Sequence, residues 1–151
     1  MNGIQIISGF FGSVGFALLF HLRGKQVFVT AAGGGLAWTV YLISGFFFSS
    51  YSVQFLISGA VLGIYMEIMA IYTKMPRTAY IAVGIIPLIP GAALYHTMYY
   101  FCQGNRALGK EYALEALVTS VSIAAGLLLA MDFWKATRRY FFKIKNQHHH
   151  D

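Results

Sequence analysis

Long apolar runs separated by short polar or charged segments dominate the sequence. The charged residues cut the chain into apolar runs of about the length that a helix needs to cross a bilayer, roughly 20 residues. We predict five membrane-spanning helices, at about residues 4–22, 27–48, 53–73, 79–101 and 116–133. Because a backbone in lipid must satisfy its hydrogen bonds within the membrane segment, this pattern indicates an all-α integral membrane protein.

Short polar segments connect the predicted spans. They are a basic turn at residues 23–25, a serine-rich turn at 49–52, a basic loop at 74–77 and a polar loop at 103–115. The first apolar run has no basic region before it and no clear cleavage site after it, so we expect a retained span rather than a signal peptide. We divide the chain into a membrane domain, residues 1–134, and a basic cytoplasmic tail, residues 135–151. In this tail we interpret His148–His150 as disordered chain or a tag remnant rather than a metal-binding tract.

Composition agrees with a membrane protein. Hydrophobic residues make up 58% of the chain and charged residues only 11%, whereas soluble domains carry about 25% charged residues. The net charge of +6 could suit nucleic-acid binding, but the basic residues lie at the ends of apolar runs, where they signal topology. We therefore expect a multi-pass protein of the cell membrane (inner or plasma membrane), in contact with lipid and not with nucleic acid.

The lysine and arginine residues also predict the orientation. With five spans, the basic segments at residues 23–25 and 74–77 lie on the same face as the tail. Nine of the 11 Lys and Arg residues then share that face, and only Arg106 and Lys110 lie on the other. Because cytoplasmic segments are enriched in Lys and Arg, this split places the N-terminus outside and the C-terminus in the cytoplasm.

Residues 84–91 read Gly-Ile-Ile-Pro-Leu-Ile-Pro-Gly and lie inside the predicted fourth span. Each proline lacks a backbone donor and clashes with the preceding turn, so we expect Pro87 and Pro90 to break this helix. Transporters bind substrates and ions at such breaks, where the freed backbone lines a cavity. The alternative interpretation is a simple proline kink.

A break here places the N-terminus of a second half-helix near Gly91, in the middle of the membrane. Helix N-termini attract anions through free N–H groups and the macrodipole, so a substrate carboxylate is the expected ligand. His96, on the first turns of this half-helix, is a candidate for binding or proton transfer, the alternative being an ordinary hydrogen-bonded polar residue. The candidate substrate-binding residues are Gly84, Pro87, Pro90, Gly91, Tyr95 and His96.

Glu67 is the only acidic residue well inside a predicted span. An intramembrane carboxylate is costly and marks a candidate functional group. Glu67 follows Gly59 and Gly63 at four-residue steps, so the three share a helix face that we expect to point into the bundle. Proton coupling by Glu67 is one hypothesis, and a structural acid bonded to a neighbouring helix is the other.

Small residues recur at four-residue spacing in other spans too, as at Ser122 and Gly126. This spacing lets helices approach closely and indicates a packed bundle or a homo-oligomer. The triplet Gly33-Gly34-Gly35 fits the same purpose, although a weak point lining a path is the alternative. The triplet lacks the Lys-Ser/Thr of a phosphate-binding loop, and no catalytic constellation or metal-ligand spacing is visible. We therefore expect no enzyme activity, metal or cofactor.

Three segments resemble a known family of membrane exporters. They are residues 15–25 (Gly-Phe-Ala-Leu-Leu-Phe-His-Leu-Arg-Gly-Lys), residues 35–42 (Gly-Leu-Ala-Trp-Thr-Val-Tyr-Leu) and, most specifically, residues 82–98, which contain the two prolines. Over about residues 10–130 the chain resembles the small membrane component of the threonine/serine exporter family, the YjjB-like proteins, which correspond to the C-terminal membrane half of ThrE-type exporters. Glu67 falls where many members carry an acid, whereas His21 and His96 stand where members often have Asn and Tyr.

The resemblance implies a subunit of a secondary exporter that uses the proton-motive force to export small amino or carboxylic acids. The substrates would be threonine and serine, as in some members, or dicarboxylates such as succinate, as in others. A larger membrane subunit of the same family is the implied partner. The alternative function is a non-transporting membrane subunit that stabilises or localises a complex.

Overall fold

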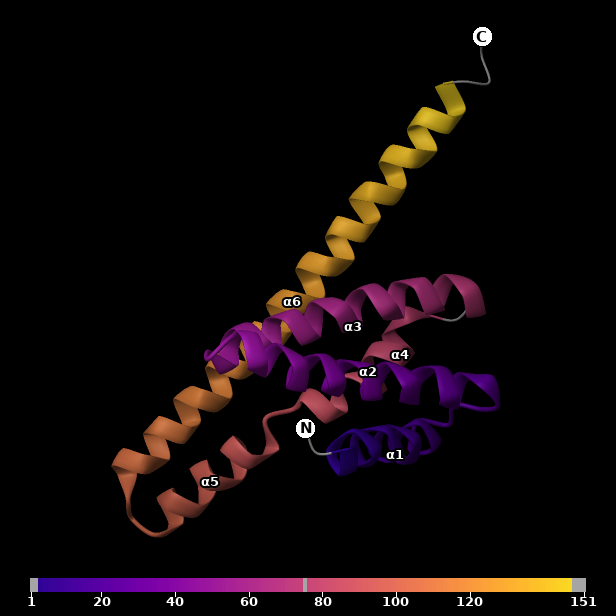
Figure 1. Cartoon of the computed structure of the whole chain (residues 1–151). Helices are drawn as coiled ribbons and strands as arrows, with labels where there is room; N and C mark the ends of the chain where they lie inside the picture. The colour runs from indigo at the N-terminus through magenta and orange to yellow at the C-terminus, as the bar shows by residue number, and fades with distance from the viewer. Residues whose placement is uncertain (1–2, 75, 148–151) are drawn as a thin grey trace.

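The computed structural model describes residues 3–74 and 76–147, with side-chain surroundings given up to residue 138. Within this part of the chain the structure is entirely helical (Figure 1), which confirms the predicted all-α class. The elements are α1 (Gly3–Leu19), α2 (Lys25–Phe47), α3 (Tyr51–Thr73), α4 (Arg77–Gly84), the short 3-10 helix η1 (Ile86–Leu88), α5 (Gly91–Cys102) and α6 (Arg106–Gln147). The His148–His150 run lies outside the described residues.

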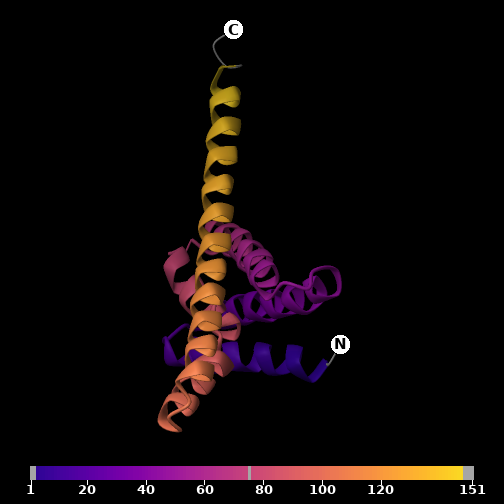
Figure 2. The ribbon, with the colours of Figure 1, turned by 90° about the vertical axis from the view of Figure 1, so that its left-hand side faces the viewer.

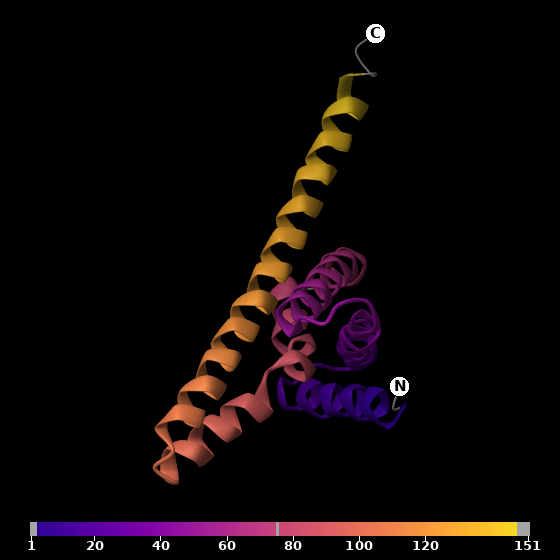
Figure 3. The same ribbon diagram turned by 60° about the vertical axis from the view of Figure 1, so that its left-hand side comes forward.

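Helices α1 to α4 pack together on one side of α6, as Figure 3 shows. Helix α5 leads away from this group, and the chain turns back at residues 103–105 so that the first part of α6 runs beside α5 (Figure 1). Helix α6 then crosses α3 and extends as a rod beyond the other helices to Gln147 (Figure 2).

Three helices, at Lys25–Phe47, Tyr51–Thr73 and Arg106–Arg138, are long and apolar enough to cross a membrane. The pair Arg77–Leu88 and Gly91–Cys102, bent by 58° at the break, makes a fourth if its two parts form one span. Helix α1 is apolar, but its 17 residues rise only about 25 Å, somewhat less than a hydrocarbon core of about 30 Å. The count of five spans and the orientation therefore stay predictions.

Helix α1 also ends earlier than the predicted first span. Its last helical residue is Leu19, and His21 adopts a left-handed φ of 59°. The Leu22 N–H donates to the Ala17 carbonyl and the His21 N–H to the Leu18 carbonyl, both at 3.0 Å. This is the Schellman pattern, which satisfies the last carbonyls of the helix.

Helix α6 differs most from the sequence prediction. A polar loop is predicted at residues 103–115, but α6 begins at Arg106 and only residues 103–105 form the turn. Gly104 takes a left-handed φ of 77°, and the Asn105 side chain accepts a hydrogen bond from the Leu108 N–H at 3.2 Å. The charged residues after Arg106 are mainly Lys and Glu, which are good helix formers, so their polarity does not stop the helix. Helix α6 also continues without interruption past residue 134, where the domain boundary was placed.

Glycines make the crossing of α3 and α6 close. A Cβ added at Gly59 would lie 2.7 Å from the Ile123 carbonyl oxygen, and one at Gly63 would lie 3.1 Å from that of Leu127. Gly126 faces the α3 backbone in the same way, because a Cβ there would collide with the Leu56 carbonyl. The small-residue spacing thus marks a backbone-to-backbone contact between these two helices.

The triplet of residues 33–35 is a packing surface in a continuous α2. A Cβ at Gly33 would collide with Met66 and Tyr65 of α3, and one at Gly34 would collide with Ser13 of α1. The helix runs unbroken from Lys25 to Phe47. The triplet therefore brings α1 and α3 close to α2 and is not a weak point in it.

Candidate functional site

The helix that begins at Arg77 is interrupted at the proline motif. Helix α4 ends at Gly84, a single 3-10 turn follows at Ile86–Leu88, and α5 begins at Gly91 after a bend of 58°. The N–H groups of Leu88 and Ile89 donate three residues back, at 2.9 and 3.2 Å. Neither Pro87 nor Pro90 has an N–H to continue the four-residue ladder, which explains why the α-helix stops here.

The start of α5 leaves backbone donors free. The Gly91 N–H donates to the Ile89 carbonyl at 2.7 Å, and the Leu94 N–H makes the first helical bond, to the Pro90 carbonyl at 3.1 Å. Between them, the N–H groups of Ala92 and Ala93 have no acceptor among the described residues. Two such donors at the positive end of a helix can hold a carboxylate oxygen.

The α2 and α3 helices cover the break from one side. A Cβ at Gly84 would lie 3.2 Å from Leu62 and closer still to Met66, both on α3, while Pro87 packs against Gly34 of α2. Leu88, between the two prolines, is completely buried. A broken helix is tolerated at membrane depth only where protein or a cavity surrounds it, and this packing meets that condition.

A hollow of about 320 Å³ opens beside Pro87. Its other lining residues come from α1 and α2: Ile4, Gln5, Ser8, Gly9 and Trp38. The indole Nε1 of Trp38 is buried and has no hydrogen-bond partner among the described residues. The sequence does not predict that α1 and α2 line this hollow. The one available signal is Trp38, because a buried Trp N–H usually finds a hydrogen-bond acceptor.

Glu67 lies elsewhere, on α3 and beside the first residue of α4. Only 6% of this residue is exposed, and its Oε1 pairs with Nη1 of Arg77 at 2.5 Å. Arg77 is the first residue of α4, and its side chain is 42% exposed. Next to the pair, the Tyr80 hydroxyl donates to the Thr73 hydroxyl at 2.8 Å. The acid is therefore buried on the expected face, but an arginine balances its charge.

Tyr95 and His96 lie on α5 but away from its first turn. The His96 ring is 5.0 Å from Tyr112 of α6 and 6.1 Å from Tyr100, so it packs inside the α5–α6 hairpin. Its Nδ1 is buried without a hydrogen-bond partner among the described residues. Tyr95 is 64% exposed and stacks along the helix on Tyr99.

The structure thus brings only part of the predicted set together. Gly84 and Pro87 pack against α2 and α3, and Pro90 and Gly91 form the start of α5 directly after them. Among the described residues, no hydrogen bond, ion pair or ring contact joins Glu67 or His96 to these four residues, although His96 contacts the Tyr95 ring edge-on. The break, the Glu67–Arg77 pair and the His96 cluster are three separate features.

Apolar helices with a break of this kind are found in many membrane transport proteins. The family comes from comparison with protein-family models, in which the Threonine/Serine exporter, ThrE, matches residues 5–132. The chain belongs to this family, which supports an exporter-type role in transport. No curated protein and no solved structure matches the chain.

Proposed function

We propose that this chain is a subunit of a secondary exporter that uses the proton-motive force to move small amino or carboxylic acids out of the cell. Threonine and serine, or dicarboxylates such as succinate, are the substrates. Family membership supports the transport role, and the break at residues 85–90 is the observation that carries the mechanism.

The substrate carboxylate binds at the start of α5 in this proposal. The free N–H groups of Ala92 and Ala93 are its hydrogen-bond donors, and Gly91 keeps the approach open because nothing lies within 4 Å of the place where its Cβ would be. Pro87 and Pro90 keep those donors out of a continuous helix. Tyr95 is exposed one turn further along and can line the path.

Glu67 couples the proton in this proposal. Taking up a proton removes the carboxylate charge and so weakens the pair with Arg77, which ties the start of α4 to α3. The preceding residue, Met66, packs against Gly84 at the other end of α4. A shift of α4 relative to α3 would therefore change the packing of Gly84 at the break. Arg77, half-exposed, can rehydrate when the pair opens.

The chain crosses the cell membrane five times in this proposal, with the N-terminus outside and the C-terminus in the cytoplasm. Helix α1 is then a short fifth span, beside the three long apolar helices and the bent pair of α4 and α5 counted as one span. A larger membrane subunit of the same family completes the exporter. The exposed apolar side chains of α5 and α6, such as Leu94, Met98 and Leu117, are available to it, to a second copy, or to lipid.

Vesicles that contain this chain, with and without its larger subunit, test the proposal. With an imposed proton gradient, we expect efflux of labelled serine, threonine or succinate only when both subunits are present. Collapse of the gradient should stop it. Efflux by the larger subunit alone at the full rate would instead assign this chain a non-transporting role in stabilising or localising the complex.

A further inference from the structure

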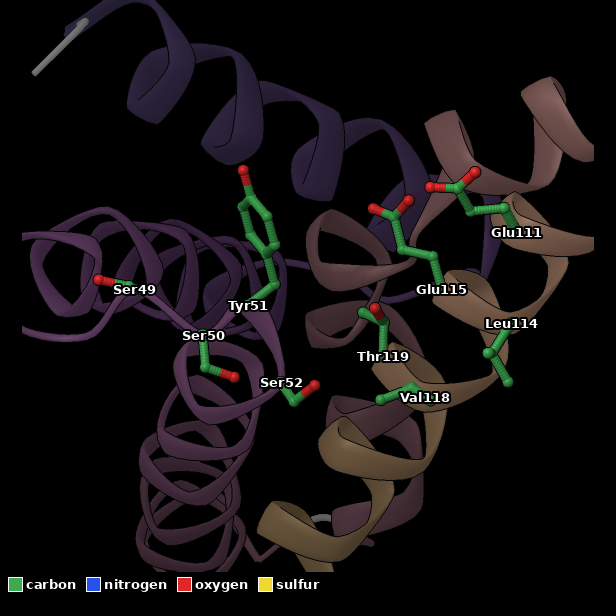
Figure 4. Close-up of a pocket in the computed structure, with 9 residues that line it drawn as sticks. All are labelled: Ser49, Ser50, Tyr51, Ser52, Glu111, Leu114, Glu115, Val118 and Thr119. Carbon is green, nitrogen blue, oxygen red and sulfur yellow. The ribbon is translucent and has the colours of Figure 1, made fainter. Parts of the chain in front are cut away.

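A second hollow lies between the α2–α3 turn and the first part of α6 (Figure 4), apart from the residues of the break. Its volume is about 490 Å³. The lining residues are Ser49, Ser50, Tyr51, Ser52, Glu111, Leu114, Glu115, Val118 and Thr119. An adjoining hollow of about 350 Å³ shares Ser49 and Tyr51 with it.

Oxygen atoms make up the polar lining of this hollow. Every polar side chain in it carries a hydroxyl or a carboxylate, and no Lys, Arg or His lines it. Glu111 and Glu115 are four residues apart on one face of α6, and Figure 4 shows both carboxylates on the side that faces Tyr51. Neither takes part in the salt bridges of the described residues, which are those of Glu67 and Asp132. The hollow therefore favours a cation.

Thr119 gives a second and independent indication of a ligand. It is only 4% exposed, yet its hydroxyl makes no hydrogen bond among the described residues. The hydroxyls of Ser120 and Ser122, on the same helix, each donate to the carbonyl four residues back at 2.8 Å. The Thr119 hydroxyl instead faces the hollow beside Glu115 (Figure 4). The Thr119 oxygen is not one of the fully buried side-chain atoms without a partner, so it stays accessible and offers a free acceptor to a donor in the hollow.

The dimensions and the donor set narrow the class of cation. No group of three or more His, Cys, Asp or Glu residues in the described chain could hold a metal ion. The volume is many times the roughly 30 Å³ occupied by one water, so a small organic molecule fits. A primary ammonium carries three donors and no acceptor, which matches two carboxylates and one hydroxyl.

We propose that this hollow binds the primary ammonium group of an amino acid through Glu111, Glu115 and Thr119. The inference rests on the proposed function, which supplies the amino acid. The predicted topology places the α2–α3 turn and the start of α6 on the same, outer face of the membrane. The site is therefore the last one that an exported serine or threonine meets, distinct from the carboxylate site at the break.

Binding to the full chain in lipid nanodiscs tests the site with three probes. Ethanolamine has the ammonium without a carboxylate, succinate has carboxylates without an ammonium, and L-serine has both. We expect Glu111→Gln with Glu115→Gln to weaken ethanolamine and serine binding about tenfold or more, since a hydrogen bond to a charged group contributes about 1.5–3 kcal/mol. Succinate binding should not change. Thr119→Val should weaken ethanolamine binding by a smaller factor.

Matched controls come from the same helix. Asp132→Asn removes a carboxylate outside the hollow, and Ser120→Ala removes a hydroxyl that bonds to the backbone. Both should leave ethanolamine binding unchanged, and thermal unfolding should show that every variant is folded. Equal ethanolamine binding in the double variant, or an equal loss in Asp132→Asn, would overturn the site. Serine efflux is measured separately, so absent efflux with intact, Glu-dependent ethanolamine binding contradicts the proposed function and not this site.

Discussion

At the scale of single residues, variants of the Glu67–Arg77 pair test whether Glu67 couples protons or only stabilises the structure. We expect Glu67→Gln to be expressed and assembled but to lose proton-coupled efflux. Its thermal stability should fall by only about 1 kcal/mol, because the unpaired Arg77 side chain is 42% exposed and can rehydrate. Asp132→Asn, which removes the exposed pair with Lys135, is the control and should change neither property.

A double variant sharpens this test. Glu67→Gln with Arg77→Gln leaves no unpaired charge, so stability should return toward that of the natural chain while efflux stays lost. Recovery of pH-dependent efflux in the double variant would show that the pair serves the structure alone.

Residue-level expectations succeed where a local spacing decides the outcome. The face of Glu67 follows from its four-residue steps from Gly59 and Gly63, and the residue is indeed buried. Its partner was not predictable, because Arg77 was assigned to a loop and reaches Glu67 only through the turn between α3 and α4. The contact of His96 with Tyr112 was not predicted for a similar reason. The sequence pattern places Tyr112 in a loop, whereas the structure includes it in α6.

The proline motif gives a prediction at the scale of an element. Replacing Pro87 and Pro90 with alanine should let α4 and α5 join, because each interior proline costs a helix about 3 kcal/mol relative to alanine. Thermal stability should then rise while substrate efflux falls, since the free donors at Ala92 and Ala93 would enter the ladder. Pro76→Ala, at the third proline, lies before α4 and should affect efflux little. Full efflux from the double alanine variant would exclude a carboxylate site at the break.

The crossing of α3 and α6 provides a second test at this scale. Gly126→Ala should destabilise the protein by about 1–3 kcal/mol, because the new methyl group meets the α3 backbone and cannot move aside. Gly15→Ala on α1 is the matched control, since nothing lies within 4 Å of its added Cβ. There the better helix propensity of alanine should leave stability equal or higher. Thermal unfolding in detergent measures both, and equal melting of the two variants would contradict a close crossing.

The elements themselves were predicted well where apolar runs set their length. The predicted spans at residues 27–48 and 53–73 differ from α2 and α3 by at most two residues at either end. The predicted fifth span starts ten residues after α6 does, because the polarity of residues 103–115 predicts a loop. Only Gly104 and Asn105 there carry turn chemistry. Helix propensity and capping, and not hydropathy, decide that boundary.

The arrangement of the whole molecule in the membrane is testable by labelling. A Cys102→Ser background removes the exposed free cysteine. In it, Ser50→Cys places one exposed thiol directly before α3, and Thr78→Cys places one at the start of α4, beyond the other end of α3. An impermeant thiol reagent applied outside intact cells should label position 50 and not position 78, as the charge distribution predicts. Labelling of both positions from outside would rule out the five-span, N-outside topology.

The length of α6 has a mechanical consequence. Its 42 residues span about 63 Å, whereas a bilayer with its headgroups is about 40–45 Å thick. An upright α6 would therefore project roughly 20 Å past the lipid. Because the rod is unbroken and α3 crosses it between its ends, a tilting α6 would pivot on α3. If a ligand in the hollow at Glu111 and Glu115 tilted α6 by about 10°, the far end of the helix would move by several ångströms. Binding at one membrane surface would then displace the chain at the other surface.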